Sequence, residues 1–249
     1  MDYKIEVCTG SVQSALEAEK GGATRVELCA NLFEGGTTPS AAAVELSCRL
    51  LKVPVYVMIR PRGGDFLYSD LEFEIMKRDI IHAQKFGAAG VVFGILRANG
   101  TVDQQRTGEL VSMAKNLKLG TTFHRAFDMS KNPVEALETI IATGCERILT
   151  SGQENKAVEG KELIKNLVSL SAGRIAIMAG SGINSTNVAE LVEYTGITEI
   201  HVSGKQRIAG GMTYRNHKIN MGGLPGIPEY ETDQTSAATI KTIVKQLKK

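Results

Sequence analysis

A short segment that begins with glycine recurs four times along this chain of 249 residues. In each copy, three residues separate the glycine from a Val or Ile, as in residues 22–26, 87–91, 144–148 and 196–200. Glycine readily adopts the left-handed conformation in which many helices end, so each copy marks a point where a helix gives way to a strand. The recurrence therefore predicts a regular alternation of helices and strands.

Short β-rich segments alternate with longer amphipathic segments over the whole length. We expect eight strands, at residues 4–8, 25–29, 55–60, 90–94, 121–124, 147–151, 175–180 and 199–203. Strands separated by helices form a parallel sheet, and eight evenly spaced units favour closure over an open doubly wound sheet. The prediction is an α/β fold with one domain over residues 1–249, a (β/α)8 or TIM barrel. Residues 205–231 form a long loop between the last strand and the last helix, either a lid or an oligomer contact.

The phase of the strands predicts which side chains point into the barrel. If the Val, Ile and Leu positions face the helices, the alternate positions face inward. That inward set includes five ionisable residues, Glu6, Glu27, Arg60, His124 and His201. An unpaired buried charge costs several kcal/mol, so these groups either pair in a structural network or form a ligand site at the C-terminal ends of the strands. We favour a ligand site, because five such groups are more than the filling of a core requires.

One set of these residues is typical of an enzyme that acts on a small anionic metabolite, phosphorylated or carboxylated, by acid/base chemistry. Arg60 and Arg62 are able to hold an anion through paired hydrogen bonds. Imidazole exchanges protons near neutral pH, which suits His124 to general acid/base catalysis. Arg125 has the opposite phase and is expected to pair with a carboxylate on the helix side. The candidate catalytic residues are Glu6, Glu27, Arg60, His124 and Asp128.

Glycine-rich loops after the last two strands are candidates for anion binding. TIM barrels often build a phosphate site at this position from backbone N–H groups. The candidate residues are Gly180, Ser181, Gly182, His201, Ser203 and Gly204. The alternative is that the glycines only form a tight turn before a helix.

Cys8 and Cys29 end the first two predicted strands in matching Glu-x-Cys tripeptides. Adjacent strands lie about 4.8 Å apart, so two inward thiols at similar height would approach one another. Soft thiolate ligands suit Cu(I). The pair is thus either a copper site or simply small hydrophobic filling. Cys48 and Cys145 fit no metal pattern and are expected to be structural.

Composition bears on the expected partners. The formal net charge of +2 is spread along the chain, whereas nucleic-acid binders concentrate basic charge. No apolar segment approaches the roughly 20 residues of a membrane helix, and the N-terminus has no signal-peptide pattern. We therefore expect a cytoplasmic protein with reduced thiols, without nucleic-acid or membrane partners.

Several uninterrupted motifs resemble those of the CutC family, which is named for a role in copper homeostasis. The motifs are Glu-Val-Cys at 6–8, Val-Glu-Leu-Cys at 26–29, and residues 34–40, 58–69, 122–128 and 149–152. The resemblance covers nearly the whole chain. It implies a cytosolic barrel, a homo-oligomer (dimer or tetramer), and Cu(I) bound by Cys8 and Cys29.

Three functions are thus open from the sequence. The first is copper homeostasis by Cu(I) binding or handling. The second is the enzyme on an anionic metabolite, and the third is a structural homo-oligomer without ligand.

Overall fold

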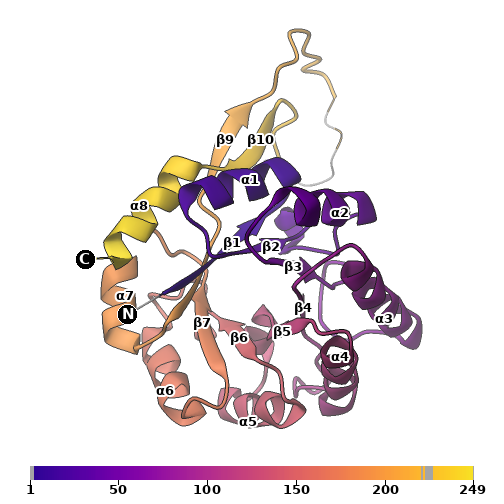
Figure 1. The fold of residues 1–249 in the computed structure, drawn as a ribbon, viewed down its shortest axis with the longest axis vertical. Helices are drawn as coiled ribbons and strands as arrows, with labels where there is room; N and C mark the ends of the chain where they lie inside the picture. Colours follow the sequence, from indigo (N-terminus) through magenta and orange to yellow (C-terminus); the bar gives the residue numbers. More distant parts are fainter. Residues whose placement is uncertain (1–2, 220, 222–226, 249) are drawn as a thin grey trace.

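The computed structural model describes residues 3–219, 221 and 227–248, and its main body is a closed barrel of eight parallel strands (Figure 1). Each strand pairs with its neighbours in sequence, and β8 closes onto β1. The strands are β1 (Lys4–Thr9), β2 (Arg25–Leu28), β3 (Val55–Met58), β4 (Gly90–Phe93), β5 (Gly120–Phe123), β6 (Arg147–Thr150), β7 (Ala176–Gly180) and β8 (Glu199–Val202). The predicted TIM barrel is confirmed, with strand boundaries within two residues of those expected.

In the described part of the chain, eight α-helices surround the barrel (Figure 1). They are α1 (Val12–Gly21), α2 (Ala41–Leu50), α3 (Asp70–Lys85), α4 (Gln104–Asn116), α5 (Pro133–Thr143), α6 (Lys161–Ser171), α7 (Val188–Thr195) and α8 (Ala237–Leu247). The repeated glycines end helices as predicted, since Gly22, Gly144 and Gly196 are left-handed caps of α1, α5 and α7.

The strand phase predicted from the sequence is confirmed by two separate hydrophobic clusters. The larger lies between strands and helices and contains every residue expected to face outward, among them Val7, Leu28 and Ile148. The smaller cluster lies inside the barrel and is formed by Cys29, Tyr56, Met58 and Val92, with Cys8, Leu32 and Ala89 packed against it. The alternate positions therefore fill the barrel interior.

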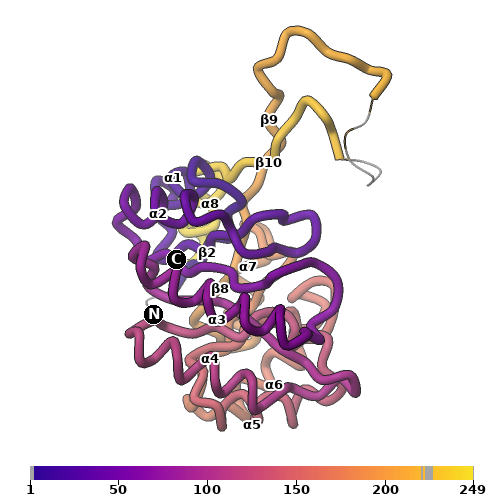
Figure 2. Tube along the Cα trace, turned by 90° about the vertical axis from the view of Figure 1, so that its right-hand side faces the viewer, coloured from indigo at the N-terminus to yellow at the C-terminus, as the bar shows by residue number. Residues whose placement is uncertain are grey.

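The segment expected to be a long loop is partly a β-ribbon. β9 (Lys205–Ala209) pairs antiparallel with β10 (Glu231–Thr235), apart from the barrel sheet. In both views the ribbon and the chain beyond it project away from the barrel, past α1 and α8 (Figures 1 and 2). Residues 220 and 222–226 of the expected loop lie outside the described residues. Among the described helices, none has the length and apolar character needed to cross a bilayer.

Candidate functional site

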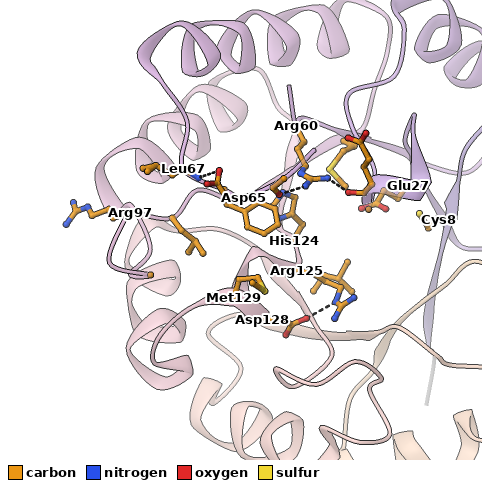
Figure 3. Close-up of a pocket in the computed structure, with 18 of the residues that line it drawn as sticks. Cys8, Glu27, Arg60, Asp65, Leu67, Arg97, His124, Arg125, Asp128 and Met129 are labelled. Atoms are coloured by element: carbon orange, nitrogen blue, oxygen red, sulfur yellow. Dashed lines mark hydrogen bonds and ion pairs between the residues drawn. The ribbon is translucent and has the colours of Figure 1, made fainter. Parts of the chain in front are cut away.

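A cavity of about 740 Å³ opens where the strands end and the loops after β3, β4 and β5 begin (Figure 3). The sequence-predicted site residues that line it are Cys8, Glu27, Arg60, His124, Asp128 and His201. The structure thus brings together residues from the ends of β1, β2, β3, β5 and β8. The C-terminal ends of the strands are where TIM barrels carry their active sites.

A thiol cluster borders the cavity, with Cys8, Glu27 and His201 in the lining and Cys29 buried outside it. The Sγ atoms of Cys8 and Cys29 lie 4.0 Å apart, and the Cys29 thiol donates a hydrogen bond to Glu27 Oε2 at 3.4 Å. His201 Nε2 lies 3.7 Å from the same carboxylate oxygen. One ligand atom from each of Cys8, Glu27 and His201 falls within 4.8 Å of the other two. This arrangement is suited to holding a metal ion.

A buried ion-pair network lies next to the thiol cluster. Glu6 Oε1 is 2.7 Å from His201 Nδ1, and Arg25 donates a hydrogen bond from Nε to Glu6 Oε2. Arg25 and Arg147 also donate to Glu199, at 2.7 and 3.0 Å. Burial by itself raises the pKa of Glu6, but the hydrogen bonds and charges of His201 and Arg25 lower that pKa to about 2. Glu6 is therefore an ionised partner that orients His201.

The four members of the thiol cluster, Cys8, Cys29, Glu27 and His201, shift one another's pKa values. The hydrogen-bond contact between the two thiols lowers the pKa of Cys8, while the same contact and burial raise the pKa of Cys29. Burial and the nearby Cys8 charge raise the pKa of Glu27. Burial alone lowers the pKa of His201, but Glu27, Cys8 and Glu6 together raise it. A Cys8 thiolate beside a His201 imidazolium is consistent with these directions, and thiolate is the form that binds metal.

Arg60 lies just beyond β3 and is almost fully buried. Its Nη1 donates to the backbone carbonyls of Glu34 and Gly36, at 2.7 and 2.9 Å, and its Nη2 donates to that of Gly64 at 2.8 Å. Three loop carbonyls thus hold the guanidinium, and its Nε has no hydrogen-bond partner among the described residues. Arg60 was expected to bind an anion through paired bonds, but the loops occupy its two terminal nitrogens.

His124 caps the short 3-10 helix η2 (Arg125–Met129) that follows β5. Its Nδ1 accepts a hydrogen bond from the backbone N–H of Ala126 at 3.1 Å, so in the neutral ring the proton is on Nε2. Burial and the charge of Arg60 lower the pKa of His124 to about 3. Nε2 is buried and has no partner among the described residues. His124 therefore presents a neutral N–H donor to this region of the cavity.

Asp128 connects the segment after β5 to the loop after β6 through hydrogen bonds. Its carboxylate accepts hydrogen bonds from the backbone N–H of Ser151 at 3.0 Å and of Gln153 at 3.2 Å, and from the hydroxyl of Thr150. Arg125 Nε donates to it at 2.7 Å. The expectation that Arg125 meets a helix-side carboxylate was wrong, because the turn of η2 directs its side chain back over Asp128 at the cavity rim (Figure 3).

Arg62 does not reach the cavity lining. Its Nε donates to Glu72 in α3 at 2.6 Å, and its Nη2 donates to the carbonyl of Leu67 at 2.7 Å. These bonds fasten the loop after β3 to α3. The predicted role of Arg62 in anion binding therefore has no support in its position.

The glycine-rich loops after β7 and β8 also lie outside the cavity lining. A Cβ atom on Gly180 would come within 2.7 Å of the Leu149 side chain and 3.2 Å of His201 Cβ, so glycine makes room for these two side chains. A Cβ on Gly204 would meet Ile240 of α8.

Hydrogen bonds within these loops involve the other candidate residues. The hydroxyl of Ser181 donates to the carbonyl of Asn155, and the carbonyl of Ser203 accepts from Thr235. Gly182 likewise accepts from Asn187. Packing and loop bonds account for these residues, and an anion site there remains a prediction.

The sequence interpretation missed the layer of the barrel nearest the N-terminal ends of the strands. This layer contains Arg25, Tyr56, Arg147 and Glu199. Each of them lies two positions before a residue that the strand alternation directs into the barrel, so its own side chain also points inward. The guanidinium groups of Arg25 and Arg147 lie over the Tyr56 ring, at 4.9 and 5.2 Å from its centre. Extending the alternation one step along each strand would have found all four.

The chain is similar to proteins of one family. The model of the CutC family matches residues 3–206. A family protein CutC of Vibrio vulnificus (strain CMCP6) is 49% identical over 248 residues, covering 100% of this chain and 99% of the relative. The human copper homeostasis protein cutC homolog is 46% identical over 248 residues, covering 98% and 90%. A crystal structure of CutC from Streptococcus agalactiae superposes with a TM-score of 0.76 at 34% identity, covering 81% of this chain and 98% of that one.

Proposed function

The chain belongs to the CutC family, and from this premise we propose that it binds Cu(I) through Cys8 and Cys29 and handles copper in the cytosol. The name of its human relative is that of a copper homeostasis protein, which supports a connection with copper. The observation that carries the proposal is the 4.0 Å separation of the two thiol sulfurs, of which Cys8 lines the cavity.

The positions of the sulfurs fit a metal with soft-ligand preference. With metal–sulfur bonds of about 2.3 Å, sulfurs 4.0 Å apart would subtend an angle of about 120° at the metal. Beside the two thiols, one ligand atom from each of Glu27 and His201 lies within 4.8 Å of the Cys8 sulfur, so either residue could complete the ligand set. Thiolate and imidazole are preferred over oxygen ligands by Cu(I). Glu27 is a harder ligand and belongs beside the site.

The surroundings of His201 support a ligand role. The ring nitrogen that faces away from the thiols is held by the Glu6 carboxylate at 2.7 Å. Metal-binding histidines commonly donate their second ring N–H to a carboxylate, which fixes the ring and makes the free nitrogen a better ligand. All four cysteines are free thiols, in keeping with a reducing compartment such as the cytosol.

A competition titration with a colorimetric Cu(I) chelator tests the proposal. We expect one Cu(I) per chain in the wild type and loss of this uptake in the double variant Cys8→Ser, Cys29→Ser. Cys48→Ser is the matched control, because Cys48 lies in α2, away from the cavity lining. Undiminished uptake by the double variant would exclude these thiols as the copper site.

A further inference from the structure

We propose that the outer part of the cavity is a separate binding site for a small organic monoanion, a carboxylate with an apolar or aromatic body. A single metal ion at the thiols uses only a small fraction of the cavity volume of about 740 Å³. That volume lies within the range of roughly 300–1,000 Å³ found for small-molecule sites. The proposal does not depend on copper binding.

The first argument is the charge of Arg60. The side chain is buried, with the residue only 4% exposed, and its hydrogen-bond partners are the carbonyls of Glu34, Gly36 and Gly64. Among the described residues no carboxylate forms an ion pair with it. Buried cations are normally paired with an anion, because an isolated charge is costly away from water. A ligand carboxylate would supply the missing negative charge.

The second argument is the cluster that Arg60 forms with His124 and Phe66. The centre of the Phe66 ring lies 5.1 Å from the Arg60 guanidinium carbon and 5.1 Å from the centre of the His124 ring. Arg60 Nε and His124 Nε2 are both buried nitrogens without a partner among the described residues. Buried polar groups are nearly always hydrogen-bonded in folded proteins. We expect these two N–H groups to donate to the oxygens of a bound carboxylate.

The apolar side chains of the lining define the rest of the ligand. Leu96 and Leu149 are buried in the lining, whereas Leu67 and Met129 remain 47% and 68% exposed. Large hydrophobic side chains that are both exposed and part of a cavity indicate contact with an apolar partner. An aromatic or aliphatic body extending from the carboxylate toward the mouth would cover them.

The charge at the rim disfavours a polyanion such as a phosphate ester. Glu34 and Asp65 line the cavity as acids, and they offset the basic side chains of Arg97 and Arg125. The backbone groups that accept hydrogen bonds from the Arg60 guanidinium are carbonyls, whereas phosphate sites are usually built from backbone N–H groups. Because Arg60 is a single positive charge without an ion-pair partner among the described residues, we expect a ligand with one negative charge.

Calorimetric titration of the full-length, metal-free protein with sodium benzoate tests the proposal. Benzamide has the same shape without the charge, and inorganic phosphate has the charge without the apolar body. We expect benzoate to bind at least about 10-fold more tightly than benzamide, because a hydrogen bond to a charged group contributes about 1.5–3 kcal/mol and each 1.4 kcal/mol is tenfold. Phosphate is expected not to compete with benzoate.

The variant His124→Asn tests whether the His124 side chain contributes to benzoate binding. Asparagine retains a side-chain oxygen that can cap η2, so the fold should persist, and we expect benzoate binding to weaken about 10- to 100-fold. His82→Asn is the matched control, because His82 is an exposed histidine of α3 outside the cavity. Absence of benzoate binding at millimolar concentration, equal affinity for benzoate and benzamide, or unchanged binding by His124→Asn would each overturn the proposal. Because copper is absent from the assay, failure of Cu(I) binding leaves this result unaffected.

Discussion

His124 shows how one side chain acquires a fixed chemical state from its surroundings. The backbone N–H of Ala126 occupies Nδ1, and the neighbouring Arg60 guanidinium opposes protonation of the ring. The side chain is therefore a neutral donor in the folded protein, although imidazole in solution titrates near pH 6.5. The acid/base role predicted from the sequence requires a proton exchange near neutrality, which this environment does not favour. A hydrogen-bond donor is the role that the environment supports.

The lowered pKa of His124 predicts a pH dependence of stability. Between about pH 6.5 and the folded-state pKa of about 3, the unfolded chain binds a proton that the folded chain does not. The contribution of His124 to the free energy of unfolding should therefore fall as the pH drops below 6.5, whereas His201, whose pKa is raised, contributes in the opposite direction. From pH 7 to 5.5 this residue should account for a loss of about 1 kcal/mol.

Urea unfolding at pH 7 and pH 5.5 measures this loss. His124→Asn should reduce the difference between the two pH values by about 1 kcal/mol, while His82→Asn should keep the wild-type difference. An equal pH dependence in the wild type and His124→Asn would contradict a buried, neutral histidine.

At the scale of elements, the barrel closes around one large side chain on β3. The Tyr56 ring lies where β4 and β5 each begin with glycine, and a Cβ atom on either Gly90 or Gly120 would clash with it. The flanking Arg25 and Arg147 stack on the same ring. Large and small residues thus alternate around this layer, as close packing of a barrel interior requires.

Gly90→Ala should therefore destabilise the protein, because the added methyl group has no room beside Tyr56. We expect a loss of about 1–3 kcal/mol in the free energy of unfolding.

Gly108→Ala is the opposite case, since Gly108 lies inside α4 with open space at its Cβ position. It should stabilise the protein by about 0.5–1 kcal/mol. Chemical denaturation of both variants checks the signs, and a neutral Gly90→Ala would show that the ring is free to move.

The elements of the barrel were predictable because their signals are local. Capping glycines and the alternation along strands identified all eight units and brought Cys8, Glu27 and His201 to one place. The directions of Arg60 and Arg62 were not predictable, because the carbonyls that hold them belong to loops whose paths depend on tertiary packing. The β9–β10 ribbon was also missed, since a polar segment such as Glu231–Thr235 shows no hydrophobic alternation.

At the scale of the whole molecule, the β9–β10 ribbon and residues 210–219 form an arm that projects away from the barrel (Figure 2). Met212 and Tyr214 follow β9 and are 63% and 73% exposed. Exposed apolar side chains grouped on a projecting segment commonly mark a contact with another protein chain. None of the described residues of the arm lines the cavity. A second copy of the chain is the partner that we expect, in line with the dimer or tetramer anticipated from the sequence.

Sedimentation velocity measures this directly. The wild type should sediment as a dimer or a larger oligomer, and the double variant Met212→Asp, Tyr214→Asp should shift toward the monomer, because two carboxylates in an apolar contact would have to lose their hydration. Leu71→Asp is the matched control, since Leu71 on α3 is 72% exposed but lies on the barrel. This control should keep the wild-type assembly. A monomeric wild type at micromolar concentration, or equal dissociation by the control, would show that the arm is not the contact. Benzoate affinity should be the same in the oligomer and in the arm variant, because the arm lies outside the cavity.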